Sequence, residues 1–202
     1  LSFFYNHHYM QIELFEQFDK LKVVCGTDEA GRGPLAGPVV AAAVILPNDF
    51  PIEILNDSKK MNQKDRIKAE KVIKEKAVAW SVTAVSHKTI DKINILNASL
   101  LAMKKCYEKI RDKGFEVSIL LCDGNKTPDV DCPVEAIVKG DGKIPEIMAA
   151  SILAKNHRDR LMVMAHEKWP QYGFNRHNGY PTKEHYEALG KYGPCPIHRL
   201  SF

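Results

Sequence analysis

Apolar residues along the chain gather in short runs separated by polar and glycine-rich stretches, and their spacing predicts strands. Residues 39–46 form an unbroken apolar run rich in Val and Ala, which is typical of a strand buried on both faces. Residues 79–85 alternate between apolar and polar positions, the pattern of a strand with one buried face. Shorter apolar runs at residues 22–27, 117–122 and 134–138 predict further strands.

Helical segments lie between these strands and after them. Asn62, followed three positions later by Asp65, has the spacing of a helix start, and the predicted helix runs to about Lys76. Pro145 is suited to the first turn of a helix that runs to about Trp169. Further helical segments are predicted at residues 11–20, from Ser86 or Thr89 to just before Gly114, and at residues 183–189.

Strands come first and then alternate with helices, which predicts an α/β domain with a mixed sheet, antiparallel near the N-terminus and parallel later. At 202 residues the chain can form one domain with a sizeable core, and it is too short for a TIM barrel. We expect residues 1–21 to be an N-terminal extension and residues 22–202 a single domain with a helical C-terminal segment. Because the sequence begins with Leu1, Met10 is a candidate natural start.

Composition and charge narrow the class of protein only in part. With 45% hydrophobic and 27% charged residues the chain is typical of a soluble globular protein, and no apolar run reaches the roughly 20 residues that cross a bilayer. Residues 1–9 do not have the pattern of a signal peptide. The net charge of +4 is compatible with a nucleic-acid partner and does not demand one. The five cysteines include no C-x-x-C pair, which argues against a zinc site or a disulfide framework and favours a cytoplasmic protein.

Several predicted strands end in or just before carboxylates. The first leads into Asp28 and Glu29, and two later ones lead into Asp123 and Asp141. Parallel neighbouring strands, spaced about 4.8 Å apart, would gather these side chains at one edge of the sheet, where they would repel one another without a cation. Such oxygen ligands suit Mg²⁺ or Mn²⁺, and two of these ions can catalyse phosphodiester cleavage. Asp123 and Asp141 each precede a glycine, so an ordinary turn is the alternative at both positions.

A glycine-rich segment at residues 31–37 follows the first two acids. It lacks the third glycine of the dinucleotide-binding fingerprint, and Pro34 and the apolar strand that follows do not fit a phosphate loop that opens a helix. Arg32 between Gly31 and Gly33 instead suggests backbone that approaches a substrate closely, with a guanidinium near a phosphate.

Longer segments in a fixed order carry a resemblance that single motifs do not. They are residues 26–46, 56–60, 121–124, 139–141 with 149–155 and 158–160, 177–185, and 196–202. Together, and over nearly the whole chain from about Val23, they resemble the ribonuclease HII family. Met148, Asn156 and His157 depart from the residues usual in that family, but they lie along a predicted helix, away from the acids in sequence.

The resemblance implies a ribonuclease H-like fold, in which helices flank a central mixed five-stranded sheet and a small helical extension follows at the C-terminus. It implies that Asp28, Glu29, Asp123 and Asp141 are the catalytic, metal-binding residues for two Mn²⁺ or Mg²⁺ ions. In this arrangement Asp28 bridges both ions and Asp141 binds the ion that activates water. Glu29 and Asp123 bind the other ion.

On the same resemblance, Gly31, Arg32 and Gly33 grip the substrate backbone, and Tyr180 senses the 2′-hydroxyl that distinguishes RNA from DNA. Lys59 lies within a matching motif and is the best candidate among the lysines for a phosphate contact. The implied enzyme cuts the RNA strand of RNA–DNA hybrids and cuts 5′ of single ribonucleotides embedded in duplex DNA. It leaves a 3′-hydroxyl and a 5′-phosphate, removes misincorporated ribonucleotides, and is expected to be a monomer.

A nucleic-acid-binding module without catalysis is the alternative on the same fold, and the clustered acids argue against it because they would repel phosphates.

Other residues have open interpretations. A phosphate-facing patch and a solvated helix face are both open for the cations Lys60, Lys64, Arg66, Lys68, Lys155, Arg158 and Arg160. Structural or substrate-adjacent roles are expected for the histidines, which lack the spacing of paired metal ligands, and packing roles for Trp80 and Trp169.

Overall fold

The structure is a computed structural model that describes residues 23–56, 58 and 61–202. In this part of the chain a five-stranded sheet has the order β3-β2-β1-β4-β5. The strands are β1 (Val24–Ala30), β2 (Val39–Ile45), β3 (Ala79–Val85), β4 (Ile119–Asp123) and β5 (Val134–Ile137). β2 runs antiparallel to β1 and β3, and β4 runs parallel to β1 and β5, so the predicted mixed sheet is confirmed.

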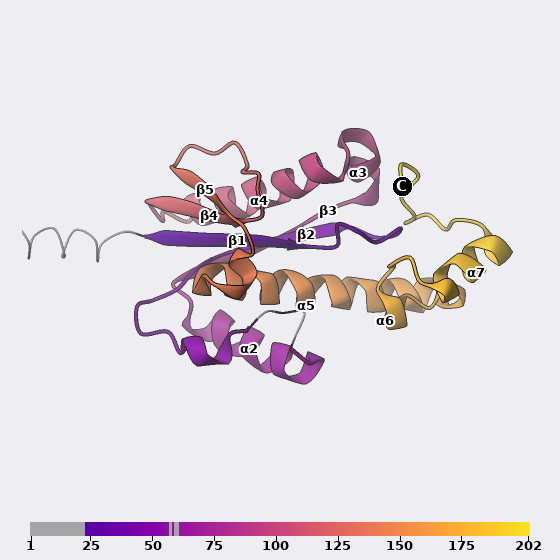
Figure 1. Ribbon diagram of the computed structural model, residues 1–202, viewed down its shortest axis with the longest axis horizontal. Helices are drawn as coiled ribbons and strands as arrows, with labels where there is room; N and C mark the ends of the chain where they lie inside the picture. Colours follow the sequence, from indigo (N-terminus) through magenta and orange to yellow (C-terminus); the bar gives the residue numbers. More distant parts are fainter. Residues whose placement is uncertain (1–22, 57, 59–60) are drawn as a thin grey trace, which may run out of the picture.

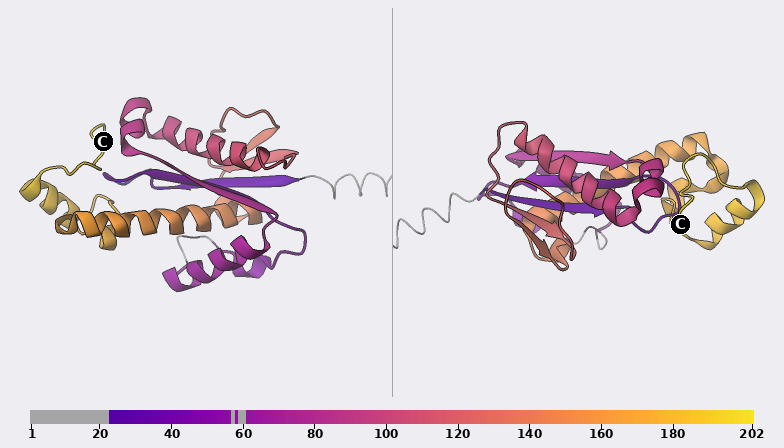
Figure 2. Two further views of the ribbon diagram at one scale, coloured as in Figure 1. Left: turned by 180° about the vertical axis from the view of Figure 1, so that it is seen from behind. Right: turned by 90° about the horizontal axis from the view of Figure 1, so that it is seen from above.

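Helices cover both faces of the sheet and extend beyond one end of it (Figure 1). They are α2 (Gln63–Lys76), α3 (His87–Ile93), α4 (Ile95–Arg111), α5 (Pro145–Lys168), α6 (Phe174–His177) and α7 (Lys183–Tyr192), with 3₁₀ helices η1 (Ile52–Ile54), η2 (Gly140–Gly142) and η3 (Pro170–Tyr172). Figures 1 and 2 show α3 and α4 on one face, α5 on the other, and α2 packed against α5 on the side away from the sheet. α6 and α7 lie beyond the end of the sheet.

β2 explains why an unbroken apolar run marks a strand at the centre of this fold. Every residue of β2 is buried, because its side chains alternate between two core clusters. The odd-numbered positions from Val39 to Ile45 pack with residues of α4, and the even-numbered positions from Val40 to Val44 pack with residues of α5. Helices on both faces thus require apolar side chains at every position.

β1 extends farther than its apolar run predicts. The strand continues through Asp28 and Glu29 to Ala30, because β2 remains paired with it over these residues. The parallel pairing with β4 ends earlier, where Thr27 lies opposite Cys122. The two acids therefore belong to the strand itself, at the point where its parallel neighbour has stopped pairing.

The helical stretch predicted between Ser86 and Gly114 is two helices. Asn94 has a φ of 64°, a left-handed conformation that Asn adopts more readily than most residues, and it separates α3 from α4. Its side chain accepts a hydrogen bond from the amide of Asn97 at 3.0 Å and so caps α4. The predicted helical stretch is confirmed, and its division into two helices went unpredicted because apolar spacing does not reveal a cap inside a helical run.

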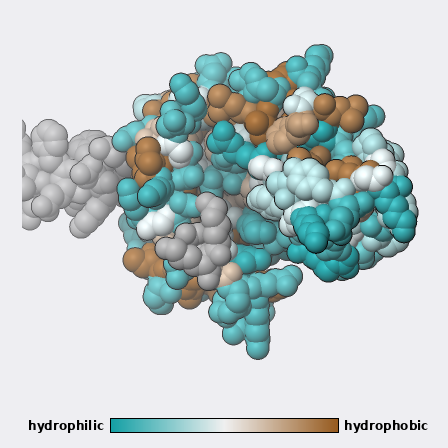
Figure 3. Space-filling model, turned by 45° about the vertical axis from the view of Figure 1, so that its right-hand side comes forward, coloured by the Kyte–Doolittle hydropathy of each residue, from teal (hydrophilic) through white to brown (hydrophobic). Residues whose placement is uncertain are grey.

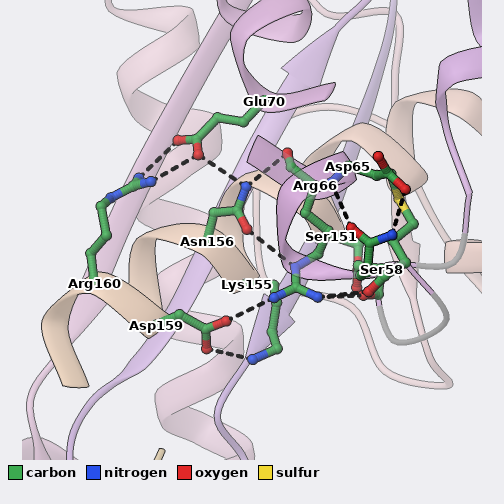
Figure 4. Close-up of polar contacts among 11 residues, drawn as sticks. Ser58, Asp65, Arg66, Glu70, Ser151, Lys155, Asn156, Asp159 and Arg160 are labelled. Carbon is green, nitrogen blue, oxygen red and sulfur yellow. Dashed lines mark hydrogen bonds and ion pairs between the residues drawn. The ribbon is translucent and has the colours of Figure 1, made fainter. Parts of the chain in front are cut away.

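Polar side chains fix α2 against α5 (Figure 4). Asn156 on α5 donates to the carbonyl of Arg66 at 2.9 Å and to Glu70 at 3.0 Å, and it accepts from Nε of Arg66 at 3.2 Å. The Arg66 guanidinium also pairs with Asp159 at 3.1 Å, and Arg160 pairs with Glu70 at 2.8 Å. Arg66 is therefore buried between the helices, and neither a phosphate-facing patch nor a solvated helix face describes it.

Replacing Asn156 with Leu is expected to destabilise the protein by about 2–3 kcal/mol, because buried polar groups of Arg66 and Glu70 lose their partner. Urea unfolding measures this change. Lys71→Ala, on the exposed side of α2, is the control and should stay within about 0.5 kcal/mol of the wild type. An Asn156→Leu variant as stable as that control would contradict the expectation.

The C-terminal segment, residues 170–202, packs around aromatic rings of its own. Tyr172 and Phe174 stack with 5.4 Å between their ring centroids. His185 packs edge-on against Phe174 and stacks on His177, and its Nε2 lies 3.0 Å from Nε2 of His198. All three histidines are buried and hydrogen-bonded, which favours the structural interpretation of these residues.

Other features of the chain bear on its class. Trp80 and Trp169 pack against core clusters, as predicted. The cysteines are all free thiols. Within the described residues, no helix has the length and apolar character needed to cross a membrane. Met10 and the helix predicted at residues 11–20 lie outside the described residues.

Candidate active site

Three carboxylates converge at the carboxyl ends of the parallel strands. Asp28 belongs to β1, Asp123 is the last residue of β4, and Asp141 lies in η2, which follows β5. One oxygen atom of each carboxylate lies within 4.8 Å of the others. In the part of the chain that the structure describes, no other group of His, Cys, Asp and Glu side chains has this geometry. The structure therefore brings three of the four acids identified in the sequence into one cluster, which we call the acidic trio.

Asp123 also holds the loop that carries Asp141. Its Oδ1 accepts hydrogen bonds from the amide of Gly140 at 2.7 Å and from the amide of Asp141 at 3.3 Å. Gly124, the next residue, has a φ of 104°, so Asp123 occupies a turn as well. The turn and the carboxylate cluster, which the sequence left as alternatives, are both present at this position.

Asp28 is deeply buried, with 4% of its surface exposed. Burial and the charge of Glu29 raise the pKa of its carboxyl well above the usual value, a hydrogen bond from Ser151 lowers it, and the charge of Asp123 raises it further. Ser151 in turn is hydrogen-bonded to Ser58, with 2.8 Å between the two hydroxyl oxygens (Figure 4). The surroundings of Asp28 thus disfavour the negative charge of its carboxylate.

Glu29 stands beside the acidic trio without being part of it. Its Oε1 accepts a hydrogen bond from Arg32 at 3.3 Å, and the Arg32 side chain is half exposed. Burial raises the pKa of Glu29, the Arg32 guanidinium lowers it, and the charge of Asp123 raises it. The Glu29 carboxylate is therefore near enough to Asp123 for the two charges to repel each other, while Arg32 forms an ion pair with Glu29.

The acidic trio fits a hard divalent cation. Carboxylate oxygens are the ligands that Mg²⁺ and Mn²⁺ prefer, and a cation would relieve the repulsion that raises the pKa of Asp28. Ser151 supports this arrangement from outside, because its hydroxyl binds a carboxylate of the trio. The donor set and its electrostatics together indicate divalent metal use.

The glycine loop, residues 31–38, lies beside Tyr180. A Cβ placed on Gly33 would be 3.6 Å from Cε1 of Tyr180, and the Arg158 guanidinium lies 5.8 Å from the centre of the Tyr180 ring. Tyr180 remains 42% exposed, so a ligand can reach it. Gly31 has a φ of 100°, and a Cβ there would lie 2.1 Å from Nε of Arg158, so both conformation and space require glycine. Lys59 lies outside the described residues.

Comparison with known proteins agrees with this geometry. The sequence model of one family, described as Ribonuclease HII, matches residues 25–202. The chain belongs to the ribonuclease HII family. It is 53% identical over 180 residues to the ribonuclease HII of Dechloromonas aromatica (strain RCB), an alignment that covers 89% of this chain and 90% of that protein. Its activity is therefore that of a type HII ribonuclease H, an endonuclease.

Solved structures give the fold of the family. The ribonuclease HII in a complex with PCNA from Archaeoglobus fulgidus is 27% identical, with a TM-score of 0.70 over 89% of this chain and 95% of that one. Bst-RNase HIII in complex with Mn²⁺ has a TM-score of 0.69 at 18% identity, over 90% of this chain and 67% of that one, and this likeness concerns the fold alone. The ribonuclease H-like fold implied by the sequence motifs is confirmed.

Ser151→Ala tests the support of the trio in this ribonuclease HII. Loss of the hydroxyl is expected to lower kcat or metal affinity by about 10–100-fold, the usual effect of removing a group that orients a ligand carboxylate. Metal titration of the cleavage rate separates the two. The control is Ser99→Ala, since the hydroxyl of Ser99 is equally buried and has no hydrogen-bond partner within the described residues. Equal activity of the two variants would contradict the role of Ser151.

A polar groove beside the site opens between α2, α5 and α6. Its lining includes Ser58, Arg66, Lys155, Asp159, Asn175 and Asn178. The surface in this part of the molecule is mainly hydrophilic, and apolar side chains form only small scattered groups (Figure 3). Lys155 lines the groove and pairs with Asp159, whereas Arg158 is buried against the glycine loop.

Sequence reasoning assigned no role to Ser151 or Arg199, and neither of its two interpretations of Arg158 describes that buried residue. Ser151 lies in a matching segment and binds Asp28, and its position in that segment was the only signal. Arg158 and Arg199 also lie in matching segments, and both contact carbonyl groups of the glycine loop. Their contacts join segments that are far apart in the sequence, so spacing alone could not reveal them.

Proposed function

We propose that the chain cuts the RNA strand of RNA–DNA hybrids and cuts 5′ of single ribonucleotides embedded in duplex DNA, leaving a 3′-hydroxyl and a 5′-phosphate. In the cell this activity removes misincorporated ribonucleotides. The observation that carries the proposal is the acidic trio, three carboxylates within 4.8 Å of one another beside an accessible tyrosine and a glycine loop. A monomer in the cytoplasm is part of the same proposal.

Two Mn²⁺ or Mg²⁺ ions are proposed for this site. Asp28 would be shared by both ions, Asp141 would hold one of them, and Glu29 and Asp123 would hold the other. When bound, the ions supply the positive charge that activates a water molecule and stabilises the leaving 3′ oxygen. Arg32 contacts only one oxygen of Glu29 and is half exposed, so its guanidinium can also reach a substrate phosphate.

The chain's own residues select and orient the substrate. The backbone of Gly31, Arg32 and Gly33 grips the sugar-phosphate chain at the ribonucleotide, and Lys59 binds a phosphate. Tyr180 stacks on the sugar and binds the 2′-hydroxyl. A deoxyribonucleotide lacks that group, so it leaves the Tyr180 hydroxyl without a partner. Its contacts with Gly33 and Arg158 fix the ring at the edge of the loop.

The experiment that tests this function uses a labelled DNA duplex with one embedded ribonucleotide, incubated with Mg²⁺ or Mn²⁺. Nicking is expected 5′ of the ribonucleotide, and none is expected with all-DNA duplex or with EDTA. An RNA–DNA hybrid is the second substrate. A folded protein that cuts neither substrate, although it binds them, would establish the binding module without catalysis and overturn the proposal.

Tyr180→Phe tests the sensor separately. The variant keeps the ring and loses the hydroxyl, so kcat/KM for the single-ribonucleotide duplex is expected to fall by about 10-fold. The matched control is Tyr186→Phe on α7, whose ring is 57% exposed and which is expected to leave kcat/KM unchanged. A Tyr180→Phe variant with unchanged kcat/KM would remove the hydroxyl from the recognition of the substrate.

A further inference from the structure

Two buried arginines lie beneath the glycine loop, and both donate only to backbone carbonyls. Arg158 on α5 is 1% exposed and Arg199 is 4% exposed. Arg158 donates to the carbonyls of Ala36 at 3.2 Å and Pro38 at 3.1 Å. Arg199 donates to four carbonyls, those of Gly31 at 2.6 Å, Arg32 at 2.9 Å, Gly37 at 3.0 Å and Pro38 at 3.2 Å.

No carboxylate of the described residues forms a direct ion pair with these guanidiniums; the charge of Asp159 acts on Arg158, and that of Asp91 on Arg199, only from farther away. Among the ion pairs of the described residues, none involves Arg158 or Arg199. Asp159, next to Arg158, is occupied by Arg66 and by Lys155. Burial and the charge of Arg158 together lower the pKa of Arg199 to about 9, so the two cations also repel each other at neutral pH. Buried charge is ordinarily paired directly, and here the direct partners are neutral carbonyls.

The same contacts shape the surface that the loop presents. Because the arginines bind its carbonyls from inside, the loop backbone is held in one conformation. Within the described residues, no hydrogen bond uses the amide of Arg32 or that of Gly33. Tyr180 packs on Gly33 and over the Arg158 guanidinium. The accessible ring therefore contacts one of the two buried charges. The loop thus combines two amides that donate no hydrogen bond within the described residues with buried positive charge bound to its carbonyls.

We propose that Arg158 and Arg199 are positioning residues for a substrate phosphate held on the outer side of the glycine loop, and that this phosphate supplies their missing negative charge. The inference rests on the proposed function, because it needs a nucleic-acid strand at the loop. It assigns the arginines a role in affinity for one particular phosphate. They do not touch the substrate; they act through the loop they hold and through their charge.

A purely structural role is the alternative, and it makes a different prediction. Arg199 also donates its amide to the carbonyl of Leu35 at 2.8 Å, and Ala36 pairs with His198, so the C-terminal residues are joined to the loop. If the arginines only hold these segments together, their removal lowers stability and the fraction of active protein. It would then weaken binding equally for every phosphate of the substrate.

The test compares affinities of the full chain for a single-ribonucleotide duplex in EDTA, where no cleavage occurs. The native duplex is compared with duplexes carrying a neutral methylphosphonate at one phosphate at a time around the ribonucleotide. At one position the wild type is expected to lose about 10-fold in affinity. Arg158→Met and Arg199→Met are each expected to bind the native duplex about 10-fold more weakly than the wild type does. For these variants, a methylphosphonate at the sensitive position is expected to lower the affinity by less than about a further 3-fold. Their affinity should also depend less steeply on salt concentration.

The control is Arg111→Met, which removes the same charge from an exposed, ion-paired arginine on α4 and should behave as the wild type on every duplex. Equal losses for the Met variants on native and neutral duplexes would leave the arginines with a structural role and overturn the inference. If the Met variants do not fold, Arg158→Lys and Arg199→Lys replace them. These keep the charge but not the multiple carbonyl contacts, so the inference requires weaker native binding with an unchanged dependence on salt.

Two outcomes separate this inference from the proposed function. Wild-type protein that nicks the duplex in Mn²⁺ but has no measurable affinity for it in EDTA would sink the inference and leave the proposed function standing. Wild-type protein that neither nicks nor binds would remove both. Thermal melting of each variant in the absence of duplex shows whether a loss of affinity reflects loss of the fold.

Discussion

Asp28→Asn is expected to lower cleavage about 1,000-fold or more while the variant stays folded and keeps its affinity for duplex. Asn has the shape of Asp and can still accept the hydrogen bond that the amide of Glu29 donates at 2.7 Å. It cannot offer the anionic oxygen that completes the acidic trio, so the charge that balances the divalent cations is lost where the reaction needs it. Single-turnover nicking measures the loss, and anisotropy measures the affinity.

The same substitution is expected to change stability in the opposite direction. Without metal, Asp28 is a buried carboxylate beside Glu29 and Asp123, so its neutral replacement should stabilise the protein by about 1 kcal/mol. Added Mn²⁺ should raise the Tm of the wild type and raise that of the variant much less, because binding to the folded state alone stabilises it. The control is Asp129→Asn, a fully exposed acid paired with Lys104, which should follow the wild type in both respects.

The role of Asp28 is tested by both cleavage and stability, because each measurement excludes a different misinterpretation. A variant that loses activity and stability together has simply been damaged, and its inactivity says nothing about metal binding. A variant that is more stable in EDTA and insensitive to Mn²⁺ has lost a ligand. Cleavage retained within about 10-fold of the wild type would contradict the role of Asp28, whatever its stability.

The clustering of the acidic trio could be predicted from the sequence because it follows from a general rule of sheet topology. Parallel strands end at a common edge, so acids at the ends of the first, fourth and fifth strands meet wherever those strands are neighbours. The burial of β2 on both faces and the cap at Asn62 were also predictable, because each depends on positions only a few residues apart. The structure shows the clustering of the trio, but the catalytic and metal-binding roles of all four acids, and the substrate roles of residues 31–33, Lys59 and Tyr180, stay predictions until variants are measured.

What the sequence could not reveal depends on contacts between distant segments. Arg199 binds the carbonyl of Gly31 across 168 positions, and Asn156 binds Arg66 across 90. The local sequence around these residues shows charge and periodicity but does not identify the partner residue. A buried arginine therefore cannot be distinguished from a solvated one by its local sequence. The break at Asn94 was missed for the converse reason, because a local left-handed residue overrode a periodic run.

Gly26→Ala is expected to be strongly destabilising for a change of one methyl group, with a loss of about 3 kcal/mol in the free energy of unfolding. Gly26 lies in the middle of β1, where a Cβ would be 2.3 Å from the backbone carbon of Glu146 and 2.4 Å from the amide nitrogen of Ile147. These atoms belong to the first turn of α5 and cannot rotate away as a side chain can. The helix therefore has to move off the strand, against the core on that face of the sheet.

Displacing α5 would also reach the chemistry, because this helix carries Ser151 and directly follows the 3₁₀ helix that contains Asp141. A shift of about 1 Å can cost about 100-fold in rate, so the folded fraction of Gly26→Ala should be slow as well as unstable. Gly190→Ala in α7 is the matched control, since a Cβ there meets nothing within 4 Å and alanine favours a helix. Urea unfolding that finds the two variants equally stable would mean that α5 can yield at its first turn, and that the close contact with β1 does not position the acidic trio.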